Sequence, residues 1–106
     1  MKQETSKFKV ISITADEHPG NALIDPCVRF TVTLQAAGRT VTDYLFTDER
    51  TQWRTISFLK SVGVYRDGMT VREALLSLDR DLTGTAVFNL DSGLNAVSRY
   101  KTAGSL

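Results

Sequence analysis

Cysteine and histidine are almost missing from the sequence, which contains one of each, Cys27 and His18. A single cysteine excludes an intrachain disulfide. Cys27 stands at the entrance to an alternating apolar run, a position more typical of a small buried side chain than of a reactive thiol. Structural zinc sites rely on several Cys or His ligands. We therefore expect no metal site, and the segment 16–20 around His18 is better explained as a polar turn.

Catalytic constellations are equally scarce. With one His and one Cys, a Ser-His-Asp or Cys-His system has few candidates. No glycine-rich loop ends in Gly-Lys-Ser or Gly-Lys-Thr, so a phosphate-binding loop is not indicated. The paired carboxylates Asp79 and Asp81 are typical of a polar link between a helix and a strand. We expect neither an enzyme nor a bound cofactor.

Long apolar runs and an excess of one charge are also lacking. No stretch approaches the ~20 apolar residues of a membrane-spanning helix, so a membrane partner is not expected. The 13 basic and 12 acidic side chains give a net charge of +1, well short of a strongly basic nucleic-acid-binding protein. The first residues are polar and contain no apolar signal segment, which predicts a cytoplasmic protein. A length of 106 residues predicts one domain over 1–106, with its core at about 7–102 and short polar tails.

Strand patterns fill the first part of the chain. The β-branched run 8–13 predicts a first strand, followed by a loop over 16–26 that holds both prolines. Apolar and polar residues then alternate over 28–35, the period-2 pattern of a half-buried strand. A second alternating run, 40–46, follows a short glycine-containing turn, so the two runs predict a hairpin. Asp43 interrupts the second run, because it falls on the apolar face.

Helical spacing replaces this alternation after residue 48. Apolar residues at three-residue steps, from Trp53 to Val62, predict a helix that begins near Glu49 and buries Trp53 in the core. Arg54 is expected on the solvated side of this helix. Gly63 stands where a left-handed residue ends many helices.

The last part of the chain returns to strand patterns after a second, shorter helix. That helix is predicted over 71–78, since Thr70 and Glu73 have the spacing of a capping box. The runs 85–90 and 94–100, separated by a turn at 91–93, predict a second hairpin.

The resulting order is three strands, a helical insertion and two strands. This is the element order of the five-stranded OB barrel, which places its helix between the third and fourth strands. The predicted fold is therefore mainly β, an OB-like barrel of order β-β-β-α-(α)-β-β. An SH3-like barrel does not usually carry a helical segment of this length at this point, and an open α+β sheet is the other alternative.

A candidate binding surface follows from the alternation. If the apolar residues of 28–35 face the core, Arg29 faces outward, and Tyr44 lies on the outer face of the neighbouring strand. Single-stranded nucleic acid is bound by aromatic rings that stack on bases and by cations that hold phosphates. The alternative is an ordinary solvated sheet face, with Tyr44 and Phe46 completing the core. The last strand adds a basic-aromatic-basic triplet, so the candidate DNA-binding residues are Arg29, Tyr44, Arg99, Tyr100 and Lys101.

Several segments together resemble a family of small bacteriophage-encoded proteins. The resemblance covers roughly residues 7–102 and is one of spacing and hydrophobic type. It lies in Asp43-Tyr44-Leu45-Phe46, Trp53, Phe58-Leu59-Lys60-Ser61-Val62-Gly63-Val64, Leu82-Thr83-Gly84-Thr85-Ala86 and Asn95-Ala96-Val97-Ser98-Arg99-Tyr100. These proteins are similar to OB-fold single-stranded-DNA-binding proteins. The resemblance thus implies single-stranded DNA binding in phage replication or recombination, inside a bacterial host cell.

A protein-interaction module of a phage, one that modulates or inhibits a host protein, is the alternative function. Phe46, Val64 and Tyr65 are its candidate contacts, and an open sheet edge would add a partner strand or form a homodimer. The near-neutral charge is compatible with host or phage protein partners. The decisive property is therefore how the 13 basic and 12 acidic groups are distributed over the folded surface.

Overall fold

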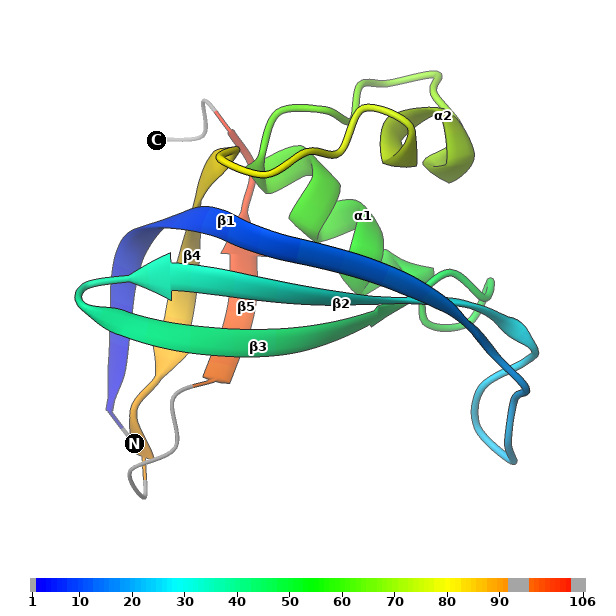
Figure 1. Ribbon diagram of the computed structural model, residues 1–106, viewed down its shortest axis with the longest axis horizontal. Helices are drawn as coiled ribbons and strands as arrows, with labels where there is room; N and C mark the ends of the chain where they lie inside the picture. Colours follow the sequence, from blue (N-terminus) through cyan, green and yellow to red (C-terminus); the bar gives the residue numbers. More distant parts are fainter. Residues whose placement is uncertain (1, 92–95, 104–106) are drawn as a thin grey trace.

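The strand order determines which side chains share a surface. In the computed structural model, which describes residues 2–91 and 96–103, five antiparallel strands are ordered β3-β2-β1-β4-β5. They form a strongly curled half-barrel (Figure 1). The strands are β1 (Gln3–His18), β2 (Cys27–Ala36), β3 (Arg39–Phe46), β4 (Thr83–Asn89) and β5 (Ala96–Lys101), and the helices α1 (Gln52–Ser61) and α2 (Val71–Leu75) lie between β3 and β4. This confirms the predicted OB-like, mainly-β fold.

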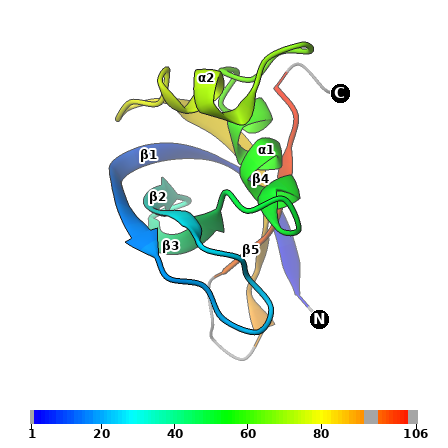
Figure 2. The ribbon, with the colours of Figure 1, turned by 90° about the vertical axis from the view of Figure 1, so that its right-hand side faces the viewer.

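β1 is longer than predicted and belongs to both layers of the half-barrel. It pairs with β4 from Gln3 to Lys9 and with β2 from Lys9 to His18. A bulge at Ile11 shifts the register against β2, and bulges bend a strand and increase its twist. Figure 2 shows β2 and β3 on one side of this bend and β4 and β5 on the other. The outer surfaces of the two layers are therefore continuous along β1.

The core fills the space between the layers. Inward-facing residues of β2 and β3, such as Leu34 and Leu45, are fully buried. The rings of Phe8, Phe58 and Tyr100 pack on one another with centroids 5.2 to 6.2 Å apart, two of the three pairs edge-on. Aromatic rings favour such edge-to-face and offset arrangements. The three rings join β1, α1 and β5 in one cluster.

The predicted buried face of α1 is confirmed at Phe58, Leu59 and Val62 but is wrong at Trp53. Trp53 is 64 % exposed, whereas Thr55, Phe58 and Leu59 are fully buried. Steps of exactly three residues drift around a helix of 3.6 residues per turn, so the buried stripe follows Thr55 and its i+3, i+4 and i+7 neighbours instead. The helix also begins later than predicted, at Gln52. Trp53 points away from the core, and its neighbour Arg54 turns toward β5.

The predicted helix ends are confirmed at two positions. Gly63 follows α1 with a φ of +80°, a conformation that glycine adopts without penalty. Thr70 and Glu73 form the predicted capping box at the start of α2, which ends at Leu75 rather than at residue 78. No helix in residues 2–91 and 96–103 is long and apolar enough to cross a membrane.

The two predicted hairpins are confirmed. β2 and β3 pair antiparallel through Ala37 and Gly38, which have φ values of +50° and +77°, as a tight two-residue turn requires. β4 and β5 pair antiparallel as well. Most of the turn predicted at 91–93 and the predicted strand start at Leu94 lie within residues 92–95, outside the described residues.

Candidate nucleic-acid interface

Hydroxyl groups cover the outer surface of the layer formed by β1, β2 and β3. The register places Thr14, Thr31 and Tyr44 side by side across the three strands, and the same holds for Ser12, Thr33 and Thr42. Directly paired residues point to the same side of a sheet, and the residues between the two rows point inward: Val32 is fully buried, and Ile13 and Asp43 are partly buried. We call Ser12, Thr14, Thr31, Thr33, Thr42 and Tyr44 the hydroxyl face.

Tyr44 is the exposed aromatic ring of the hydroxyl face. Its side chain faces outward and is 53 % exposed, so Tyr44 does not complete the core. The guanidinium carbon of Arg29 lies 5.8 Å from the centre of the Tyr44 ring. Phe46 also faces outward, where its ring meets that of His18 edge-on at 5.2 Å. The structure therefore brings two of the predicted site residues, Arg29 and Tyr44, together.

The charge of Arg29 is already engaged by a carboxylate. Its Nε and Nη2 donate to the two oxygens of Asp16 at 3.2 and 2.7 Å. This hydrogen-bonded pair raises the pKa of Arg29 and holds the guanidinium beside the Tyr44 ring. The region around Tyr44 is thus electrically balanced, and a phosphate would have to compete with Asp16 for Arg29.

Tyr100 is a correction to the predicted site. Its ring is 8 % exposed and packs between Phe8 and Phe58, so it has no free face on which a base could stack. The cause is the period of a strand: when Arg99 and Lys101 face outward, the residue between them faces inward.

The Tyr100 hydroxyl takes part in a polar cluster where β3, α1 and β5 meet. It donates to Oδ2 of Asp43 at 2.7 Å, and Nη2 of Arg54 lies 3.0 Å from the same oxygen. Arg54 also donates to the main-chain carbonyls of Val97 and Ser98 on β5. Arg54 is therefore not on the solvated side of α1, as predicted, but links the helix to the open edge of β5.

Replacing Tyr100 with phenylalanine is expected to flatten the loss of stability at high pH. Burial, followed by the nearby Asp43 carboxylate, raises the pKa of Tyr100 far above its ordinary value of 10.0. Above about pH 10 the unfolded phenol loses its proton while the folded one keeps it, so the free energy of unfolding falls by about 1.4 kcal/mol per pH unit.

This component of the alkaline slope is absent from Tyr100→Phe, whereas the other titrating groups contribute equally to both proteins. Urea unfolding between about pH 9 and pH 11.5 measures the two slopes. Parallel slopes for the wild type and the variant would contradict the burial of an uncharged Tyr100.

The remaining predicted site residues, Arg99 and Lys101, lie on the other layer. Both are exposed on the outer surface of β5, away from Arg29 and Tyr44. The register pairs Lys101 with Thr85 of β4, and Thr85 with Lys7 of β1. Lys7 was missed at the sequence level because the first strand was predicted to begin at residue 8, after a short polar tail, whereas β1 begins at Gln3.

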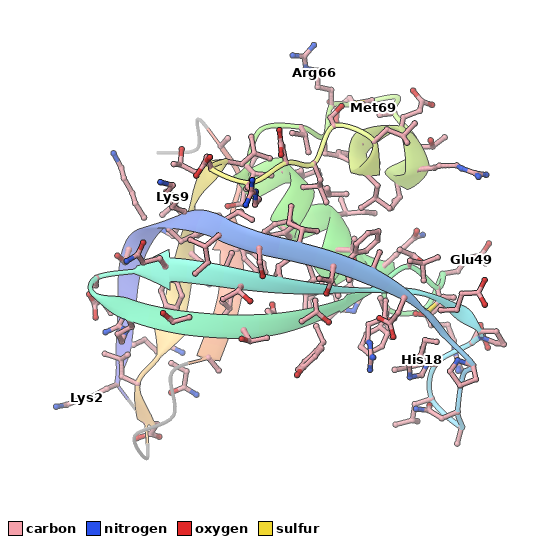
Figure 3. The ribbon with its side chains drawn as sticks, viewed as in Figure 1. Lys2, Lys9, His18, Glu49, Arg66 and Met69 are labelled. Carbon is pink, nitrogen blue, oxygen red and sulfur yellow. The ribbon has the colours of Figure 1, made fainter. Side chains whose placement is uncertain are left out.

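Carboxylates gather at the opposite end of the molecule. An open pocket of about 780 Å³ lies between the β1–β2 loop and the segment that follows β3. Its wall includes Glu17, Asp25, Asp48 and Glu49, and Figure 3 shows His18 and Glu49 at this end. The hydroxyl of Thr51 donates to Asp48 and lowers its pKa. Asp25 is paired with Arg50 at 3.7 Å, so the excess negative charge at this end comes from the other three carboxylates and disfavours a polyanion.

No group of three or more His, Cys, Asp and Glu side chains within the described residues converges as a metal site. Comparisons of the chain with family models, with curated proteins and with solved structures found no match. The resemblance to phage single-stranded-DNA-binding proteins therefore stays a prediction.

Proposed function

We propose that this protein binds single-stranded DNA on the hydroxyl face, with Tyr44 as the stacking platform. The observation that carries the proposal is the half-exposed Tyr44 ring on the edge strand β3, in register with Thr31 of β2 and Thr14 of β1 on the hydroxyl face. Stacking on an aromatic ring accommodates any base, and threonine and serine hydroxyls donate to phosphate and sugar oxygens. In line with the resemblance, the proposed role is in phage replication or recombination in the cytoplasm of a bacterial host.

The balanced charge around Tyr44 shapes the expected binding. Arg29 is paired with Asp16, so the hydroxyl face offers base stacking and neutral hydrogen bonds rather than a strong field. Non-specific affinity for DNA comes mainly from cations that neutralise phosphates. We therefore expect modest affinity at the hydroxyl face alone, with little dependence on salt.

Replacing Tyr44 with alanine is expected to weaken binding to a short oligothymidine by about 2 kcal/mol, or about 30-fold in Kd. Tyr44→Phe keeps the ring and is expected to bind within about twofold of wild type. Fluorescence anisotropy of a labelled oligonucleotide at low salt measures all three proteins. Equal affinities for wild type and Tyr44→Ala would rule out the stacking role, and no binding by wild type at micromolar concentration would rule out the function.

Trp53 favours one alternative function, a module that binds a host or phage protein. An exposed tryptophan is unusual on a free surface and frequent at the centre of protein interfaces, and this one is 64 % exposed. Of the three contacts predicted from the sequence, Val64 and Tyr65 pack partly against the core, and Phe46 packs against His18. A partner retained from nuclease-treated lysate by wild type and lost with Trp53→Ala would support this alternative.

A further inference from the structure

Three cations stand together on the outer surface of the second layer. Lys7 and Lys101 flank Thr85 in the register of β1, β4 and β5, and Arg99 flanks Val87 one step further along. Neighbouring strands lie about 4.8 Å apart, so Lys7 and Lys101 are about 10 Å apart at their backbones. We call Lys7, Arg99 and Lys101 the basic row.

The basic row carries a net positive charge. None of its members forms an ion pair with a described acidic residue, unlike Arg29, Arg39, Arg50, Arg54 and Lys9. In the register, the side chains that share this surface are Gln3, Thr5, Lys9, Thr83, Thr85, Val87, Asn89 and Ala96, none of them acidic. Three cations within about one Debye length reinforce one another.

Although five ion pairs mix opposite charges elsewhere, one group of cations and one group of carboxylates lie apart from each other. The basic row lies on the β1–β4–β5 layer, whereas four carboxylates line the pocket beyond the far ends of β1 and β2. Figure 3 shows Lys9 at the bend of β1, at the opposite end from His18 and Glu49. A DNA strand leaving Tyr44 would be repelled by the pocket and attracted toward the bend.

β1 connects the hydroxyl face to the basic row. Its outward residues run from Thr14 through Ser12 and Lys9 to Lys7, past the bulge at Ile11. At about 3.3 Å per residue this path is roughly 23 Å long, or about seven nucleotides at the 3.4 Å rise of a stacked strand. That length fits within the 4–16 nucleotides that an OB fold typically covers.

We propose that the phosphates of the bound DNA strand cross the bend of β1 and are held by Lys7, Arg99 and Lys101 on the β1–β4–β5 layer. This inference rests on the proposed function, and it assigns DNA binding to two surfaces with different contacts. Tyr44 supplies stacking, while the basic row supplies the phosphate contacts that the neutralised Arg29 cannot. Thr5 and Thr85, on the same surface, add hydroxyl donors for phosphate oxygens.

The two surfaces differ in their response to salt, which allows separate tests. The test variant is Lys7→Gln/Arg99→Gln/Lys101→Gln, and its matched control is Arg50→Gln/Arg66→Gln/Arg72→Gln, which removes the same charge from exposed arginines elsewhere. Binding of the intact chain to an oligothymidine of about 15 nucleotides is measured by anisotropy between about 50 and 150 mM salt. Thermal unfolding of each variant tests whether a loss of DNA affinity comes from a loss of folding. The variant Lys7→Arg/Lys101→Arg keeps both charges and is therefore expected to keep the affinity.

For single strands, each lost phosphate contact reduces the slope of log K against log salt by about 0.7, so the test variant is expected to lose about 2 units of slope. The ratio of the wild-type binding constant to that of the test variant is then expected to fall about tenfold as the salt rises from about 50 to 150 mM. The matched control is expected to keep the wild-type slope, and Tyr44→Ala to lose affinity at every salt concentration.

Equal slopes for the test variant and the matched control would contradict phosphate binding by the basic row. The proposed function, which depends on Tyr44, would not be affected. Absence of binding by wild type would overturn both. A slope reduced in the test variant alone supports the phosphate path across β1.

Discussion

Replacing Asp43 with alanine is expected to lower the free energy of unfolding by about 3 kcal/mol. The carboxylate accepts a hydrogen bond from the Tyr100 hydroxyl and pairs with Arg54 at the same oxygen. The side chains of Asp43 and Arg54 are only 14 % and 23 % exposed. Removing one partner from such a pair leaves the other charge without compensation away from water, and it leaves a buried hydroxyl without its acceptor. Urea unfolding measures the loss.

A second aspartate of the same sheet provides the control for this loss. Asp16 pairs with Arg29 at 2.7 Å, a shorter distance than that of Asp43 to Arg54, but its side chain is 49 % exposed. Exposed ion pairs contribute about 0–1 kcal/mol, so Asp16→Ala is expected to cost less than about 1 kcal/mol. Similar losses for the two variants would show that the Asp43 cluster is no more than a surface contact.

The Asp43 cluster matters because the half-barrel is not closed by strand pairing in the described residues. β3 and β5 are the two ends of the strand order, and an open strand edge presents unpaired main-chain groups. Arg54 of α1 satisfies two carbonyls of β5, and Asp43 of β3 is held to the same arginine. The helix thus joins the two edges through side chains. Asp43→Ala is therefore expected to loosen β5, which carries Arg99 and Lys101.

Local patterns predicted the elements, because each depends on neighbours in the chain. The alternation over 28–35 determines which side of β2 faces the core, and the Thr70–Glu73 spacing is sufficient to start α2. Asp43 broke the alternation of its strand, and that irregularity marked the cluster with Arg54 and Tyr100. A charged residue on an apolar face was therefore a signal of a buried polar contact.

The sequence predicted Arg99 and Lys101 of the basic row but not Lys7, because the place of Lys7 depends on pairing between distant segments. Lys7 meets Lys101 across β4 only once the register of β1, β4 and β5 is known. Grouping Arg99, Tyr100 and Lys101 by their adjacency overlooked that neighbours in a strand face opposite sides. Trp53 was misplaced because a spacing of three residues is compatible with more than one buried side of a helix. The contact of Arg54 with β5 shows which side of α1 faces the sheet.

The second large effect is expected at Gly84, which pairs with Phe8 in the β1–β4 register. A methyl group at this position would lie 2.6 Å from Cζ of Phe8 and 2.9 Å from the main-chain oxygen of Ser61, and it would also overlap the Ser61 hydroxyl. That hydroxyl accepts a hydrogen bond from the main-chain N–H of Thr85 and donates to the Thr85 carbonyl. A side chain here would push α1 away from β4. Gly84→Ala is expected to cost about 3 kcal/mol, at the upper end of typical overpacking.

Two comparisons identify the cause as steric rather than conformational. Gly38 has a φ of +77°, and a methyl group added there would meet no atom within 4 Å. Gly38→Ala is therefore expected to lower the free energy of unfolding by about 1 kcal/mol, through the backbone conformation alone. Gly84→Ala combined with Phe8→Leu is expected to cost less than the sum of the single changes, because the shorter side chain removes Cζ from the clash. Additive losses would mean that the ring of Phe8 does not lie over Gly84. The close approach of β4 to both Phe8 and the end of α1 is thus what requires glycine at position 84.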